Sequence, residues 1–261
     1  MFFRLNSLEL ALILFGVVAA ATVSGVLIGR YLRRHSETVR EPFGVLQGAL
    51  LGVVGLVLAF GLSLAVGRYE SRRAAVVAEA NAIGTTYLRA QLLAEPERTR
   101  SLGLLRDYTD LALQVSEEVP GSDGMRRTLA AQSVVQRDLW GLAGDAVDGA
   151  PVATAPRLYV QTLNEMIDQQ TVRVAALGNR VPGAVLLVEV LGAAVALGVL
   201  GLYLAVLGRG LVTMLAAAAL VTMLLLVTFD LDRPTRGLIT VPATPLEVLR
   251  ASMALPPAAG G

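Results

Sequence analysis

The side chains that carry out chemistry in enzymes are scarce in this sequence. Its 261 residues include no cysteine and a single histidine, His35, which lies among arginines in a hydrophilic segment. A hydrolase or transferase needs a nucleophile with a partner base, a cluster of metal ligands or a loop that cradles phosphate, and none of these patterns is present. We therefore expect no enzyme and no cofactor, and interpret His35 as a solvated or headgroup-facing residue.

Three carboxylates are worth following because they lie within or next to long apolar segments. Glu189 lies near the start of one such segment, where an acid is a functional candidate unless it reaches the lipid headgroups. Asp230 and Asp232 follow another apolar segment, and their hard oxygen ligands would suit a shared cation. Two carboxylates are few for a metal site, and salt bridges with Arg233 and Arg236 are the alternative.

The composition places the chain in a membrane. Hydrophobic residues make up 54% of it and charged residues only 16%, unlike an ordinary soluble domain. Four apolar stretches, at residues 8–29, 44–67, 184–208 and 211–228, reach the roughly 20 residues that a helix needs to cross the hydrocarbon layer. A net charge of +1 gives no reason to expect nucleic acid as a partner. We predict a multi-pass protein whose first partner is the lipid bilayer.

The hydrophilic residues 68–183 lie between the second and third stretches. No turn signal separates them from residue 67, so we predict one long helix that leaves the membrane and continues into this block. Proline and glycine then mark the ends of further helices, and no alternating strand pattern occurs. The sequence thus predicts an all-α integral membrane protein with membrane parts at 1–67 and 184–229, a helical soluble domain at 68–183, and a C-terminal loop, short helix and tail at 230–261.

Two local signals predict where particular helices begin. Pro42 should close the loop between the first two membrane helices, because proline is excluded from a helix interior. Thr244, Pro245 and Glu247 should occupy the cap, first and third positions of the short C-terminal helix, in a capping box.

The arginines give two conflicting predictions of orientation. The short connection at residues 30–42 is rich in arginine, which favours a cytoplasmic location for it and an external location for the helical domain. The arginines that flank the spans on the domain side favour the reverse. The residues alone leave both orientations open.

Four bulky positions recur in the membrane part of the second helix. Val53, Leu56, Phe60 and Leu64 follow one another at intervals of three or four residues, so they share one helix face. Rings of such side chains in an oligomer would form a hydrophobic constriction in a pore. Contact with lipid or with the protein core is the alternative.

Beyond the membrane the same helix carries an apolar seam, from Val76 to Ala90, flanked by polar residues. The polar set could line a water-filled vestibule, and the arginines at the membrane boundary could attract anions. Interfacial anchoring and helix pairs such as Glu70 with Arg73 are the alternatives. The candidate vestibule set comprises Arg68, Arg72, Arg73, Glu79, Asn81, Thr85 and Arg89.

Three segments resemble the bacterial bestrophin-like family of membrane proteins: AFGLSLAVGRYESRRAAVVAEANAIGTTYLRA at 59–90, NEMID at 164–168, and FDLDRPTRGLI at 229–239. More remotely, the chain is similar to the bestrophins, pentameric anion channels with four membrane helices per subunit and a cytosolic helical domain. The resemblance implies a homo-oligomer, by analogy a pentamer, in the cell inner membrane, with chloride or other small inorganic ions as partners and the helical domain in the cytoplasm.

Two functional hypotheses follow. The first is a homo-oligomeric, bestrophin-like anion channel with the second helix lining the pore. The second is a non-conducting membrane scaffold or sensor whose helical domain binds a partner protein.

Overall fold

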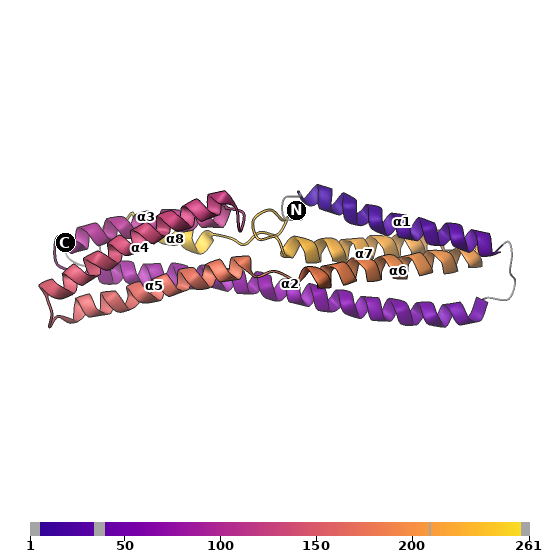
Figure 1. Cartoon of the computed structure of the whole chain (residues 1–261), viewed down its shortest axis with the longest axis horizontal. Coiled ribbons are helices and arrows are strands. Elements are labelled where there is room, and N and C mark those ends of the chain that lie inside the picture. Colours follow the sequence, from indigo (N-terminus) through magenta and orange to yellow (C-terminus); the bar gives the residue numbers. More distant parts are fainter. Residues whose placement is uncertain (1–5, 34–39, 209, 257–261) are drawn as a thin grey trace. The chain divides into compact units, whose positions relative to one another are not determined.

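The computed structural model describes residues 6–33, 40–208 and 210–256, and these ranges contain eight α-helices and no strand (Figure 1). The described chain divides into two compact units. Residues 1–68 and 180–239 form a membrane unit, and residues 69–179 and 240–261 form a helical domain. The all-α fold expected from the sequence is confirmed.

The membrane unit contains α1 (Ser7–Arg33), the first part of α2 (Arg40–Ala90), α6 (Gly183–Leu207) and α7 (Leu211–Leu231). Within the described residues, four helices are long and apolar enough to cross a membrane. The start of α2 differs from the expectation: the helix begins at Arg40, so Pro42 lies in its first turn. Proline is tolerated there because the first backbone N–H groups of a helix have no acceptor within the helix.

Helices α1 and α6 pack with their backbones in close contact. A Cβ atom at Gly25 would overlap the Gly198 carbonyl, and one at Gly201 would lie 2.6 Å from the Thr22 carbonyl oxygen. Small residues permit such an approach where lipid provides no hydrophobic drive for helix association. Gly208, with a φ of 69°, ends α6 in the left-handed conformation and begins the tight connection to α7.

The helical domain packs five helical segments around one apolar core. They are the second part of α2, α3 (Glu97–Glu117), α4 (Asp123–Gly149), α5 (Thr154–Gly178) and α8 (Thr244–Ser252). The core includes the fully buried side chains of Ile83, Leu105, Leu139, Leu163 and Met166. Ser122 caps α4 by accepting a hydrogen bond from the Met125 backbone N–H, as its side chain predicts.

Helix α8 is attached to the domain by its buried end. Met253 has no exposed surface, and its carbonyl oxygen accepts hydrogen bonds from Tyr87 Oη at 3.3 Å and Arg106 Nε at 3.1 Å. The predicted capping box is wrong by one position: the helix begins at Thr244 itself, Ala243 occupies the cap, and no side chain caps the helix.

Candidate functional site

The predicted neck residues lie on one open face of α2. Val53, Leu56, Phe60 and Leu64 are 61%, 57%, 63% and 45% exposed, respectively. Residues between them on the helix, such as Leu58 at 4%, are buried. All four side chains are bulky and apolar, so exposure of this face to water would be unfavourable. The face is therefore expected to contact lipid or other protein.

A row of small residues on α2 is open as well. Cβ atoms added at Gly48, Gly52 and Gly55 would meet no described atom within 4 Å. Backbones approach closely at glycine between α1 and α6, and Gly44 and Gly61 of α2 lie against Tyr203 and Glu189 of α6. Between these two glycines, the α2 row has no described atom in contact with it. Such a row allows a helix from outside the protomer to approach closely.

Glu189 of α6 is completely buried in the membrane unit. Its carboxylate lies against α2 so closely that a Cβ atom at Gly61 would overlap Oε1. Neither carboxylate oxygen has a hydrogen-bond partner among the described residues. An acid buried in a membrane helix without a described partner remains a candidate functional residue.

The structure divides the predicted vestibule set. Arg73, Asn81 and Thr85 are exposed, whereas Arg68 and Arg89 are half-buried, and Arg89 donates a hydrogen bond to the Leu158 carbonyl at 2.7 Å. The other two members, Arg72 and Glu79, are 1% exposed. This burial contrasts with the expectation that Glu79 lines a water-filled vestibule and that Arg72 is a boundary arginine able to attract anions.

Arg72 donates hydrogen bonds to backbone carbonyls of the helical domain. Its Nη2 donates to the Asn179 carbonyl at 2.8 Å and its Nε to the Ala176 carbonyl at 3.3 Å. These carbonyls lie at the C-terminal end of α5, where helix carbonyls lack partners within the helix and the helix dipole favours a cation. The Arg72 side chain thus supplies hydrogen-bond donors and a positive charge to the C-terminal end of α5.

The exposed part of the vestibule set lines a groove between α2 and α8, with a volume of about 870 Å³. Arg73, Asn81 and Thr85 contribute polar atoms to it, and Val77 and Val248 contribute apolar surface. No carboxylate lines the groove within the described residues. Arg73 pairs with Glu70 at 3.7 Å. Both side chains are exposed, so this ion pair contributes little to stability.

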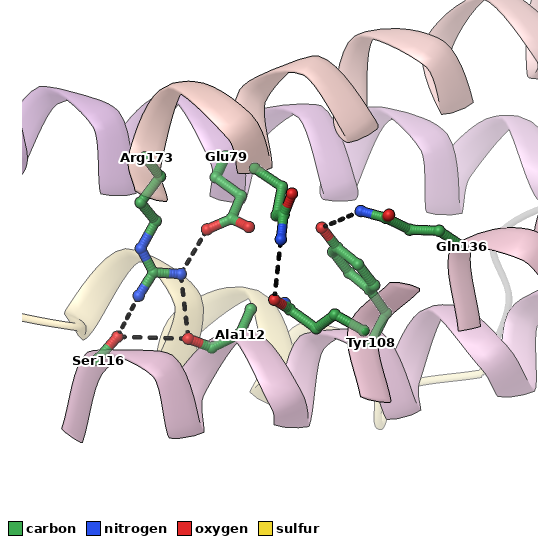
Figure 2. Close-up of polar contacts among 8 residues, drawn as sticks. Glu79, Tyr108, Ala112, Ser116, Gln136 and Arg173 are labelled. Carbon is green, nitrogen blue, oxygen red and sulfur yellow. Dashed lines mark hydrogen bonds and ion pairs between the residues drawn. The ribbon is translucent and has the colours of Figure 1, made fainter. Parts of the chain in front are cut away.

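Glu79 forms the centre of a buried polar network in the helical domain (Figure 2). Its carboxylate accepts a hydrogen bond from Arg173 Nη1 of α5, and the two side chains are 1% and 2% exposed. Arg173 also donates to the Ala112 carbonyl at 3.0 Å and to Ser116 Oγ at 2.5 Å, both on α3. The network therefore connects three helices through one buried cation.

Two further polar contacts extend this interior. Gln136 donates a hydrogen bond to Tyr108 Oη at 3.3 Å, and Gln170 donates to Gln132 at 3.3 Å. Burial raises the pKa of Glu79, against the opposing effect of Arg173. Burial, with the nearby Glu79 charge, also raises the pKa of Tyr108. These groups connect the helices of the domain interior, and none of them lines the groove between α2 and α8.

The two carboxylates at the C-terminal end of α7, Asp230 in its last turn and Asp232 at its cap, fix the loop that follows the helix. Asp230 pairs with Arg233 at 2.9 Å and accepts a hydrogen bond from the Ile239 backbone N–H at 2.9 Å. Asp232 accepts one from the Val181 backbone N–H at 2.9 Å, which ties this loop to the start of α6. Among the described residues no group of three or more potential ligands could hold a metal ion. His35 lies outside the described residues.

The arrangement defines a class of protein: an all-helical membrane protein whose second membrane helix continues into a helical domain. The family model for the bestrophin-like domain matches residues 10–246, and the chain belongs to this family. The sequence resemblance is thereby confirmed. A comparison with curated proteins gives no match.

Solved structures of a bacterial bestrophin homologue from Klebsiella pneumoniae are similar to this chain. Crystal structures of two single-substitution variants match with TM-scores of 0.69 and 0.71 at 13% and 14% sequence identity. They cover 93% and 94% of this chain and 97% and 96% of theirs. A further crystal structure of that homologue matches with a TM-score of 0.65 at 15% identity, covering 90% of this chain and 97% of that one. At these identities the similarity establishes the fold.

Proposed function

We propose that the protein is a homo-oligomeric anion channel of the cell inner membrane, by resemblance a pentamer, with α2 lining the pore. The observation that carries the proposal is the apolar face of α2, where Val53, Leu56, Phe60 and Leu64 are between 45% and 63% exposed. Repeated around an axis, this face would form a narrow apolar neck that gates or selects through dewetting.

The open glycine row supports assembly through the same helix. Gly48, Gly52 and Gly55 meet no described atom, so a neighbouring copy can approach α2 closely beside the bulky face. One helix then supplies both the contact between subunits and the constriction. Helices that only faced lipid would need no such row.

The groove of the helical domain supports a preference for anions. Its lining includes Arg73 with the amide of Asn81 and the hydroxyl of Thr85, and no described carboxylate. Arg73 brings a positive charge to this surface, weakly offset by its exposed pair with Glu70, and the guanidinium and the Asn81 amide can donate hydrogen bonds to a partly dehydrated anion. A cytoplasmic helical domain agrees with the arginines that flank the spans on the domain side.

The test is chloride flux in liposomes that contain the purified full-length protein. Phe60→Ala should change the flux at least severalfold, because it removes the largest side chain of the proposed neck. Phe15→Ala is the matched control: Phe15 of α1 is 57% exposed and Phe60 is 63% exposed, but Phe15 lies outside the proposed pore helix. Its flux should equal that of the wild type.

Particle imaging of the same preparation should show several subunits around an axial pore. A monomer, or liposomes with no flux above protein-free ones, would refute the channel. A monomer that gives no flux and binds a partner protein in a fixed stoichiometry would instead support the scaffold or sensor hypothesis.

A further inference from the structure

A cleft with two arginines lies at one end of the membrane unit. It has a volume of about 290 Å³ and is formed by the last turns of α1 and by the connected ends of α6 and α7. Val26, Leu204 and Met214 provide an apolar floor. Arg30 and Arg33 are the charged residues of its lining, and both are exposed.

The length of α1 indicates that the arginines reach the depth of lipid phosphates. The uncharged part of α1, from residue 10 to residue 29, is about 30 Å long at about 1.5 Å per residue, which matches the hydrocarbon thickness. The charged heads that follow at Arg30 and Arg33 therefore emerge at the headgroups, while the floor of the cleft continues into the hydrocarbon layer. A ligand that fills the cleft must be anionic at one end and apolar at the other.

The charges in the cleft are available to such a ligand. No carboxylate of a described residue lines the cleft, and neither arginine has an ion pair or hydrogen bond to a described residue. Gly208 allows the guanidinium of Arg33 to lie across the end of α6, since a Cβ atom there would be 2.5 Å from Nη1. Guanidinium groups match phosphate oxygens through paired hydrogen bonds, which an ammonium group cannot reproduce.

We propose that this cleft binds an anionic phospholipid. Arg30 and Arg33 would donate hydrogen bonds to the phosphate, and one acyl chain would lie along Val26, Leu204 and Met214. The lipid would occupy the space beside the α6–α7 connection and hold α1 to this hairpin. The inference is independent of ion conduction.

The experiment is native mass spectrometry of the full-length protein in detergent, titrated with phosphatidylglycerol. The wild type should retain phosphatidylglycerol in preference to phosphatidylcholine. The double variant Arg30→Gln, Arg33→Gln should bind it about thirtyfold more weakly, from the typical contribution of two basic residues near an anionic lipid surface. Arg127→Gln is the matched control, because Arg127 is an exposed arginine of the helical domain, and its affinity should not change.

Two further arms complete the test. The variant Arg30→Lys, Arg33→Lys keeps the charge and tests the paired hydrogen bonds, and it should lose affinity only severalfold even if the glutamine variant does not fold. Millimolar inorganic phosphate should leave the lipid bound, because it cannot fill the apolar floor. Equal retention of both lipids, unchanged affinity in both double variants, or displacement of lipid by free phosphate would each overturn the proposal.

Discussion

Replacing one partner of the buried Glu79–Arg173 pair should strongly destabilise the helical domain. At the effective dielectric constant that suits protein sites, two charges about 4 Å apart attract by about 4 kcal/mol. The side chains are 1% and 2% exposed, so water cannot replace the lost partner. In Glu79→Leu, Arg173 keeps its hydrogen bonds to Ala112 and Ser116 but becomes an uncompensated buried cation. We expect a loss of about 3–5 kcal/mol in the free energy of unfolding.

The double variant Glu79→Leu, Arg173→Met should recover most of this loss, because apolar residues of similar size often replace a buried ion pair without net cost. The assay is urea unfolding of the full-length protein in detergent. Trp140, the single tryptophan of the chain, lies in α4 and reports on the domain. With a slope of about 2 kcal/mol per molar urea, the single variant should shift the midpoint by about 2 M.

An exposed ion pair provides the matched control. Arg126 pairs with Asp123 while 66% and 81% of their side chains are exposed, so Arg126→Met should cost less than about 1 kcal/mol. If Glu79→Leu also cost less than about 1 kcal/mol, or if the two single losses simply added in the double variant, the reasoning from buried charge would be refuted.

Three further predictions follow from other contacts. In Arg173→Met, burial should raise the pKa of Glu79 further, because the main opposing effect, that of Arg173, is removed. The folded state then holds the proton more tightly, so stability present below the ordinary value of 4.5 should be lost as the pH rises through the folded pKa. In urea titrations at rising pH, the double variant with Glu79→Gln should show no such loss. Gly25→Ala should lower the melting temperature in detergent because its Cβ would overlap the Gly198 carbonyl, while Gly16→Ala, with open space at that position, should not. Met253→Ala should cost about 2–5 kcal/mol because the side chain is fully buried. Arg250→Ala, which breaks a partly exposed pair with Asp110, should cost about 1 kcal/mol, and equal losses in urea unfolding would contradict this distinction.

Much of the architecture follows from apolar length and the absence of turn signals. The four membrane helices are predicted because only a helix or a closed barrel satisfies the backbone in lipid, and the segments are long enough for helices. The continuation of α2 into the helical domain follows from the same pattern, since nothing near Gly67 would stop a helix.

The polar interior was not predictable in this way. Glu79 and Arg173 lie on different helices, and periodicity alone assigns charged residues to the outside of each one. Only their juxtaposition in the folded domain allows both to be buried. The sequence does carry one signal, because Gln170 shares a helical face with Leu163, Ile167 and Val174, and in the structure it contacts Gln132.

The position of α8 has a consequence for the synthesis of the protein. Leu246 and Met253 are completely buried in the core of the helical domain, yet they follow α7 along the chain. During translation the domain core therefore remains incomplete, with an apolar opening, until the last membrane helix has been made and released for insertion. A chain that stalls before α8 would expose the apolar core of the domain to chaperones and proteases. The domain core can therefore close only after α7 has been synthesised.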